Sequence, residues 1–162
     1  MSLTPERLSG RRPFSVTASP YPSSCVSEEV EGFLSRYFPE CFTVMHEQKC
    51  GGFIDISPHG LAYILKCIFF EVFGKSVISI VFNDSAEEYD LRMSFSSDEP
   101  ISQSAEKDIR DMASDSGFWL VMGRLGRDNY ISLKTQKRPA REFAVYARDF
   151  NLITQAFNSV FF

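Results

Sequence analysis

The sequence predicts an α+β protein: a two-layer α/β sandwich in which helices cover one face of a mixed, mostly antiparallel sheet, with an added C-terminal helix. Short apolar segments of alternating or continuous pattern lie between Gly-, Asp- and Asn-containing turns, as is typical of strands. Longer segments between them repeat apolar residues three and four positions apart, as is typical of amphipathic helices. The chain has 162 residues, of which 44% are hydrophobic, so one ordinary domain with a substantial core is expected.

The N-terminal segment differs in composition from the rest of the chain. Residues 1–24 are rich in Ser, Pro and Arg and show no sustained hydrophobic period. We expect them to form a flexible tail or leader, in which residues 14–18 are a candidate for a short edge strand. Residues 25–162 are expected to form a single α/β domain.

The first elements of this domain are marked by helix-capping and turn residues. A helix is expected to begin at Ser27, a good N-cap, and to end at Pro39. Strands are expected at residues 41–45 and 53–56, separated by the turn-forming pair Gly51-Gly52.

The strongest helix signal follows directly. Ser57 is expected to cap this helix, Pro58 to occupy its first position and Gly74 to end it. Between them, apolar residues recur at helical spacing on one face. The opposite face also carries aromatic residues, including Tyr63 and Phe70, where an exposed helix would be polar. We therefore expect these aromatics to fill a cleft or to be covered by another element, for which the C-terminal helix is the candidate.

The second half of the domain repeats the alternation of strand and helix. Paired strands are expected at residues 77–82 and 91–95, followed by a helix that Ser104 caps. A hairpin is expected next, with strands at residues 118–122 and 130–133 around a glycine-containing turn.

Two charged segments connect or follow these strands. The acidic segment NDSAEEYD lies at residues 83–90, and the basic segment KTQKRPAR lies at residues 134–141. A Ca²⁺ loop would need ligands at alternate positions and a central Gly, which the acidic segment lacks. We interpret both segments as solvated loops.

The C-terminal segment, residues 140–162, carries six apolar side chains at spacings of three and four positions, the pattern of a helix seam. These residues are Phe143, Tyr146, Phe150, Ile153, Phe157 and Val160. One interpretation is a helix that covers the core. The other is a partner-binding seam for another protein or for a second copy in a homodimer.

Composition argues against several classes of ligand. The net charge is −4 and no basic stripe stands out, so no nucleic-acid binding is expected. No apolar run is long enough to span a bilayer, so no membrane insertion is expected. The four cysteines lack metal-ligand spacing, so we expect reduced thiols, a cytoplasmic location and no metal site.

The order of these elements resembles a known family. Residues 53–82, FIDISPHGLAYILKCIFFEVFGKSVISIVF, are similar to a strand, an Asp-containing turn, a long asparagine-bearing helix and the next strand of the GHKL superfamily, the ATP-binding domains of histidine kinases, gyrase, heat-shock chaperones and mismatch-repair proteins. Residues 90–102, DLRMSFSSDEPIS, are similar to the strand before that family's Asp-x-Gly motif. The resemblance covers residues 26–133 and implies a histidine-kinase ATPase fold and bacterial two-component signal transduction.

The nucleotide-contacting positions of the family do not carry over. In the family, two asparagines four positions apart on the long helix face the nucleotide and its Mg²⁺. The matching positions here are Lys66 and Phe70, and Glu71 is the only carboxylate nearby.

The two other nucleotide motifs are degraded as well. The Asp-x-Gly motif, which reads adenine in the family, falls at residues 97–99, where Asp98 is one position out of register and no glycine follows. The Gly-x-Gly of the phosphate lid is reduced to Gly117. These five positions are the candidate cofactor site: Lys66, Phe70, Glu71, Asp98 and Gly117.

These departures predict a non-catalytic signalling or regulatory domain that acts through protein–protein contacts, with no catalytic residue, no cofactor and no ATP binding. The alternative is a divergent but active ATP-binding sensor histidine kinase catalytic domain, in which Glu71 replaces the metal ligand and Asp98 reads adenine. A third interpretation is a structural domain that dimerises through residues 140–162.

Overall fold

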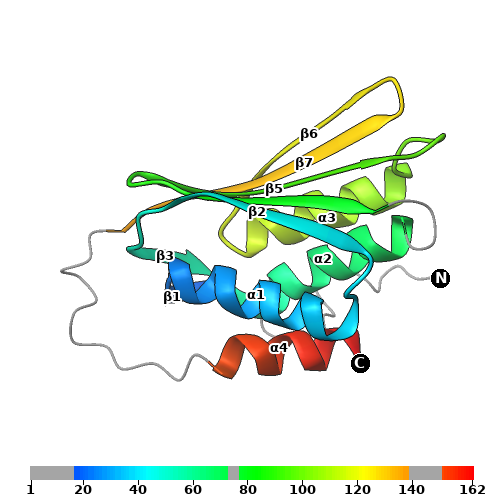
Figure 1. Cartoon of the computed structure of the whole chain (residues 1–162). Helices are drawn as coiled ribbons and strands as arrows, with labels where there is room; N and C mark the ends of the chain where they lie inside the picture. The colour runs from blue at the N-terminus through cyan, green and yellow to red at the C-terminus, as the bar shows by residue number, and fades with distance from the viewer. Residues whose placement is uncertain (1–16, 73–76, 139–150) are drawn as a thin grey trace.

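Helices cover one face of a five-stranded mixed sheet in the computed structural model (Figure 1). The structure describes residues 17–72, 77–138 and 151–162. One strand pairing of the sheet is parallel and the other three are antiparallel, as predicted for a mixed, mostly antiparallel sheet. Together with the helices on one face, this sheet confirms the predicted two-layer α/β fold. In spatial order the strands are β2 (Phe42–Lys49), β4 (Ile78–Asp84), β5 (Glu88–Ser96), β7 (Asp128–Gln136) and β6 (Trp119–Leu125).

A short antiparallel ribbon lies beside this sheet. It pairs β1 (Ser19–Pro22) with β3 (Phe53–Ile56). Strand β1 lies in the segment that the sequence predicts to be a flexible tail. The local composition does not reveal this strand, because it forms by pairing with β3, which is a tertiary interaction. The expected edge strand at residues 14–18 lies largely outside the described residues.

Helix α1 (Ser23–Tyr37) begins four residues before the expected cap at Ser27. Pro22 is the N-cap residue and has an extended backbone. Ser27 is instead buried within the helix, where its hydroxyl lies 2.7 Å from the Tyr89 hydroxyl. The expected start was wrong because Ser27 serves a buried side-chain contact rather than the backbone.

Helix α2 (Pro58–Val72) begins where the sequence predicts. The Gly60 amide donates to Ser57 Oγ at 3.2 Å, so Ser57 caps the first turn. The predicted end at Gly74 lies outside the described residues.

Helix α3 (Gln103–Asp115) is capped by Ser102 and not by Ser104. The Ala105 amide donates to Ser102 Oγ at 3.2 Å. The helix ends before Gly117, which has a φ of +97°. A Cβ at that position would lie 2.4 Å from the Asp55 carbonyl oxygen, so glycine is required both by the left-handed backbone and by the close approach.

Helix α4 (Asn151–Phe161) packs on α1 and α2, on the side away from the sheet (Figure 1). Ile153 and Phe157 are fully buried in the core, and Val160 packs against it. These three residues of the predicted seam are therefore occupied by packing within the chain. The other three, Phe143, Tyr146 and Phe150, lie outside the described residues.

The core lies between the sheet and the helix layer. Inward-facing residues alternate with outward-facing ones along β4, β5 and β7, as expected for a sheet with one covered face. Rings from three helices extend the core: Phe33 of α1 lies 5.3 Å from Phe157 of α4 between ring centroids, and Phe38 lies 5.4 Å from Phe69 of α2. Aromatic contacts therefore join α4 to α1 and the end of α1 to α2.

Candidate functional site

The five candidate nucleotide positions do not all lie together. Helices α2 and α3 run antiparallel, with Gly60 close to Ser116 at one end and Glu71 bonded to Ser102 at the other. The connection from β5 to α3 has six residues, 97–102, and α3 packs against α2. Asp98 lies within this connection and Glu71 bonds to its last residue, whereas Gly117 lies at the far end of α3.

Lys66 is used to fasten α4. Its Nζ donates to the Val160 carbonyl oxygen at 2.9 Å and lies 5.5 Å from the centroid of the Phe70 ring. Val160 is in the last turn of α4, where carbonyl groups lack partners within the helix and the helix dipole favours a cation. The Lys66 ammonium therefore stabilises the end of α4.

The aromatic face of α2 is covered only in part. Tyr63 is half-buried and packs against the core, whereas Phe70 is 62% exposed. The expected contact with the C-terminal helix is found at Lys66, which bonds to Val160 of α4, but the expected cover is wrong for Phe70. The reason is geometric, because α4 ends at Phe161 beside Lys66 and reaches no further along α2.

Glu71 caps a helix. Its Oε1 accepts a hydrogen bond of 3.2 Å from the backbone amide of Ser102, the N-cap residue of α3. In a capping box this amide is bound by a Glu or Gln three residues further on, but Ala105 occupies that position here. Glu71 supplies the missing carboxylate from α2, next to the positive end of the α3 dipole.

Asp98 lies at the surface of the six-residue connection. Its Oδ1 forms an ion pair of 3.0 Å with Arg127 Nε, and both side chains are exposed. Arg124 of β6 holds the backbone of the connection in place. It donates to the carbonyl oxygens of Ser97 and Asp98 at 3.1 and 3.0 Å. No sequence signal marked Arg124, because its partners are backbone atoms.

The two charged segments interpreted as solvated loops are partly buried and neutralise each other. Lys137 Nζ lies 2.5 Å from Asp84 Oδ1, and these two side chains are only 7% and 4% exposed. Lys134 Nζ lies 3.4 Å from both Glu88 Oε1 and Asp90 Oδ2. Both solvated-loop interpretations are therefore wrong for these residues, because each burial is compensated by a charge from the other segment.

Asp84 and Lys137 are the centre of a buried polar cluster. Asp84 Oδ2 accepts from Ser23 Oγ at 2.8 Å and from the Gly51 amide at 3.2 Å. Lys137 Nζ also donates to the carbonyl oxygens of Gly51 and, at 2.7 Å, of Ser85. The cluster joins the start of α1, the β2–β3 turn, the end of β4 and the end of β7, which is a structural role.

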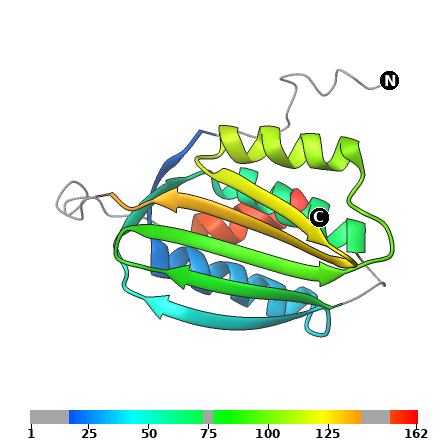
Figure 2. The ribbon, with the colours of Figure 1, turned by 90° about the horizontal axis from the view of Figure 1, so that it is seen from above.

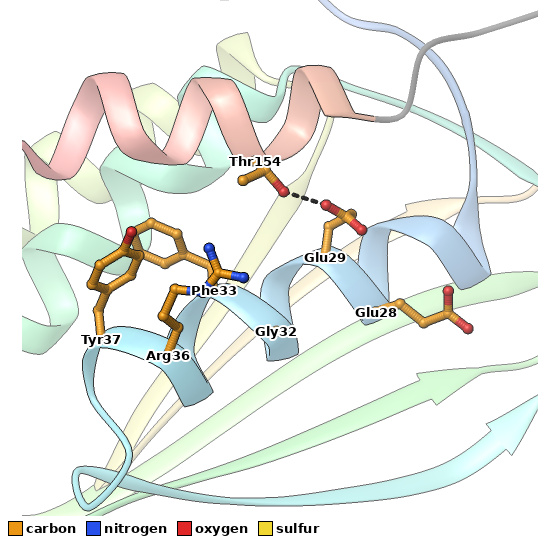
Figure 3. Close-up of a pocket in the computed structure, with 7 residues that line it drawn as sticks. All are labelled: Glu28, Glu29, Gly32, Phe33, Arg36, Tyr37 and Thr154. Atoms are coloured by element: carbon orange, nitrogen blue, oxygen red, sulfur yellow. Dashed lines mark hydrogen bonds between the residues drawn. The ribbon is translucent and has the colours of Figure 1, made fainter.

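A shallow groove lies between α1 and α4 (Figure 3). Thr154 of α4 donates a hydrogen bond to Glu29 of α1 across it. Gly32 leaves space in its middle, since a Cβ there would meet nothing within 4 Å. Its lining residues are Glu28, Glu29, Gly32, Phe33, Arg36, Tyr37 and Thr154. Sequence reasoning missed this groove because its two walls are more than a hundred residues apart in the chain.

Within residues 17–72, 77–138 and 151–162, no group of three or more His, Cys, Asp or Glu side chains is arranged to hold a metal ion. In the same residues, each helix is too short or too polar to cross a lipid bilayer.

No protein-family model and no curated protein sequence matches the chain. Solved histidine kinase domains do match its structure. The catalytic domain of histidine kinase ThkA aligns with a TM-score of 0.55 and 10% identity over 75% of this chain and 98% of that domain. The histidine kinase domain of the E. coli osmosensor EnvZ aligns with a TM-score of 0.53 and 7% identity over 86% of this chain and 96% of that one.

The ATP-binding domain of PrrB from Mycobacterium tuberculosis aligns with a TM-score of 0.51 and 11% identity over 76% of this chain and 99% of that domain. At such identities the similarity concerns the fold. It agrees with the element order that the sequence suggested and with the mixed sheet covered on one face. The chain therefore has the fold of the catalytic, ATP-binding domains of histidine kinases.

Proposed function

We propose that this chain is a non-catalytic signalling or regulatory domain, which uses a histidine-kinase-type scaffold for protein contacts and does not bind ATP. One observation carries the proposal: Glu71, the carboxylate next in sequence to the matched position Phe70, accepts the Ser102 amide and caps α3. A carboxylate in this role is already engaged with a helix N-terminus, so Mg²⁺ would have to compete with that bond.

The neighbouring charge supports the same conclusion. Lys66 is held by the last turn of α4, because its ammonium donates to the Val160 carbonyl oxygen. Phosphate binding would require Lys66 to leave that partner. The short β5–α3 connection, fixed by Arg124, holds α3 against α2.

Contacts with another protein are supported by the exposed surface of the helix layer. The groove between α1 and α4 carries acidic residues at one end and Arg36 at the other. Arg36 forms no ion pair with any residue that the structure describes. Unpaired charges of both signs at a groove suit a polar, reversible protein contact.

The alternative, a divergent active kinase domain, is favoured by one observation. Asp98 is strongly exposed, and together with Glu71 it places two carboxylates at the same short connection. In that case Asp98 would read adenine and Glu71 would bind the metal.

Isothermal titration calorimetry with Mg-ATP separates the two functions. We expect no saturable heat with the wild-type chain at millimolar nucleotide, and none with Asp98→Ala. Saturable heat that Asp98→Ala removes, and that the control Glu99→Ala retains, would show the nucleotide site that the kinase alternative requires and would overturn the proposal.

A further inference from the structure

Strand β6 forms one edge of the sheet (Figures 1 and 2). Its outward-facing side chains are apolar. Trp119 and Val121 are each 42% exposed, and Leu125 is 81% exposed. All three lie on the face that the described helices leave uncovered, whereas Leu120 and Met122 point to the core. Within the described residues β6 pairs only with β7, so its other side presents backbone amide and carbonyl groups.

The neighbouring strand extends this apolar surface toward the edge. Tyr130 of β7 is directly opposite Gly123 of β6 and is nearly half-exposed. A Cβ at Gly123 would lie 2.1 Å from the Tyr130 hydroxyl oxygen, so the tyrosine side chain lies across the glycine. Gly123 therefore makes room for an aromatic ring at the outer edge of the sheet.

The two edges of the sheet differ in their protection against strand pairing. The opposite edge, β2, has an irregularity between His46 and Gln48 and carries Glu47, which pairs with Arg92 at 2.6 Å. Bulges and charges of this kind prevent edge-to-edge association. The single charge of β6, Arg124, is turned to the six-residue connection and leaves the edge unguarded.

We propose that β6 pairs antiparallel with β6 of a second copy of this chain, which joins the two sheets into one. Residues opposite each other in such a pair must lie on the same face. A two-fold axis at Met122 satisfies this requirement and pairs all seven residues of the strand.

This arrangement is self-complementary in shape and charge. Trp119 of each copy lies opposite the exposed Leu125 of the other, and Val121 lies opposite Gly123. Arg124 lies opposite Leu120, so no like charges face each other. The two Trp–Leu contacts are equivalent, as an isologous interface requires.

The exposed area sets the strength of this dimer. The side chains of Trp119, Val121, Leu125 and Tyr130 expose roughly 450 Å² per copy, which is the size of a functional surface patch. Two copies would bury at most about 900 Å², which is the size of a weak, transient interface. The dimer is therefore weak and reversible, and it forms whether or not the domain binds ATP.

Analytical ultracentrifugation of the full chain between about 5 and 500 µM tests this dimer. We expect a monomer–dimer equilibrium that Leu125→Glu and Leu125→Lys each weaken at least tenfold. Two substitutions of opposite charge exclude an effect of net charge alone.

Met45→Glu is the matched control, since Met45 is 59% exposed on the outer face of β2 at the opposite edge. It should leave the dimer unchanged. Circular dichroism melting of each variant confirms that it folds. A chain that is monomeric throughout, or a dimer that both Leu125 variants leave intact, would overturn the proposal.

Discussion

At the scale of single residues, burial determines which polar groups the chain keeps and what they bind. Asp84, Asp90 and Lys137 belong to sequence segments with the composition of solvated loops, yet they are buried or nearly so. Their partners come from the other segment, about fifty residues away. No local sequence pattern predicts which residues of the two segments form ion pairs. By contrast, Ser57 was predicted correctly because its partner, the Gly60 amide, is three residues away.

Asp84→Ala is expected to lower the free energy of unfolding by about 3–5 kcal/mol, because it leaves the Lys137 ammonium buried without its carboxylate. Urea unfolding measures the change. Glu87→Ala, an exposed neighbour, is the control and should change stability by less than about 0.5 kcal/mol. The double variant Asp84→Ala/Lys137→Met should be more stable than Asp84→Ala alone. Equal stability of Asp84→Ala and wild type would refute the role of this pair.

Cys67 is expected to be an unreactive thiol. Burial raises its pKa from 9.0 to about 11, so at pH 8 it has roughly a hundredfold less thiolate than an ordinary cysteine. Since the thiol pKa is raised by folding, its contribution to stability is complete below pH 9 and is lost as the pH rises toward 11. Iodoacetamide labelling followed by mass spectrometry should modify the exposed Cys50 first. Equal labelling rates at Cys67 and Cys50 in the folded chain would contradict this account.

At the scale of helices and strands, predictions succeeded where local residues decide the structure. The bounds of β3 and the start of α2 follow from the Gly51-Gly52 turn and from Ser57-Pro58. The predicted cap of α3, Ser104, is wrong, and Ser102, which has the same intrinsic preference for an N-cap, caps the helix instead. Glu71 decides between them by binding the Ser102 amide, which is information from another helix.

Strand β1 and the position of α4 could not be predicted from the sequence either, because both depend on contacts with distant elements. The SPYP segment of β1 contains two prolines, which disfavour a strand, and it forms one only because β3 pairs with it. The apolar spacing of residues 151–161 predicted a helix seam, but the surface that it covers is set by rings on α1 and α2.

Phe157→Ala tests whether α4 belongs to the core. Phe157 is fully buried and lies 5.3 Å from Phe33 between ring centroids, so its truncation should lower the free energy of unfolding by about 3–5 kcal/mol. Leu152→Ala on the exposed side of the same helix should cost less than about 0.5 kcal/mol. Chemical denaturation of the two variants gives the comparison. If both variants lose the same stability, α4 does not pack as described.

At the scale of the whole molecule, the fold is shared with histidine kinase domains while the residues at the candidate nucleotide positions differ. The order of strands and helices matches histidine kinase ATP-binding domains at 7–11% identity, because the alternation of apolar residues is enough to specify the layers. Three of the candidate nucleotide positions have structural roles here. Lys66 bonds to the end of α4, Glu71 caps α3, and Gly117 allows a close turn against β3. The resemblance could suggest the fold, but it could not predict these structural roles, because they depend on contacts between distant elements.

Thermal unfolding in the presence of Mg-ATP and Mg-ADP tests the central claim most directly, because any ligand that binds only the folded state raises its apparent stability. With about 5 mM nucleotide and a Kd of about 0.1 mM, binding would add roughly 2 kcal/mol and raise Tm by about 4–8 °C. We predict that Tm stays within about 1 °C of its value without nucleotide, a shift that corresponds to well under 1 kcal/mol. A rise of several degrees with either nucleotide would contradict the account.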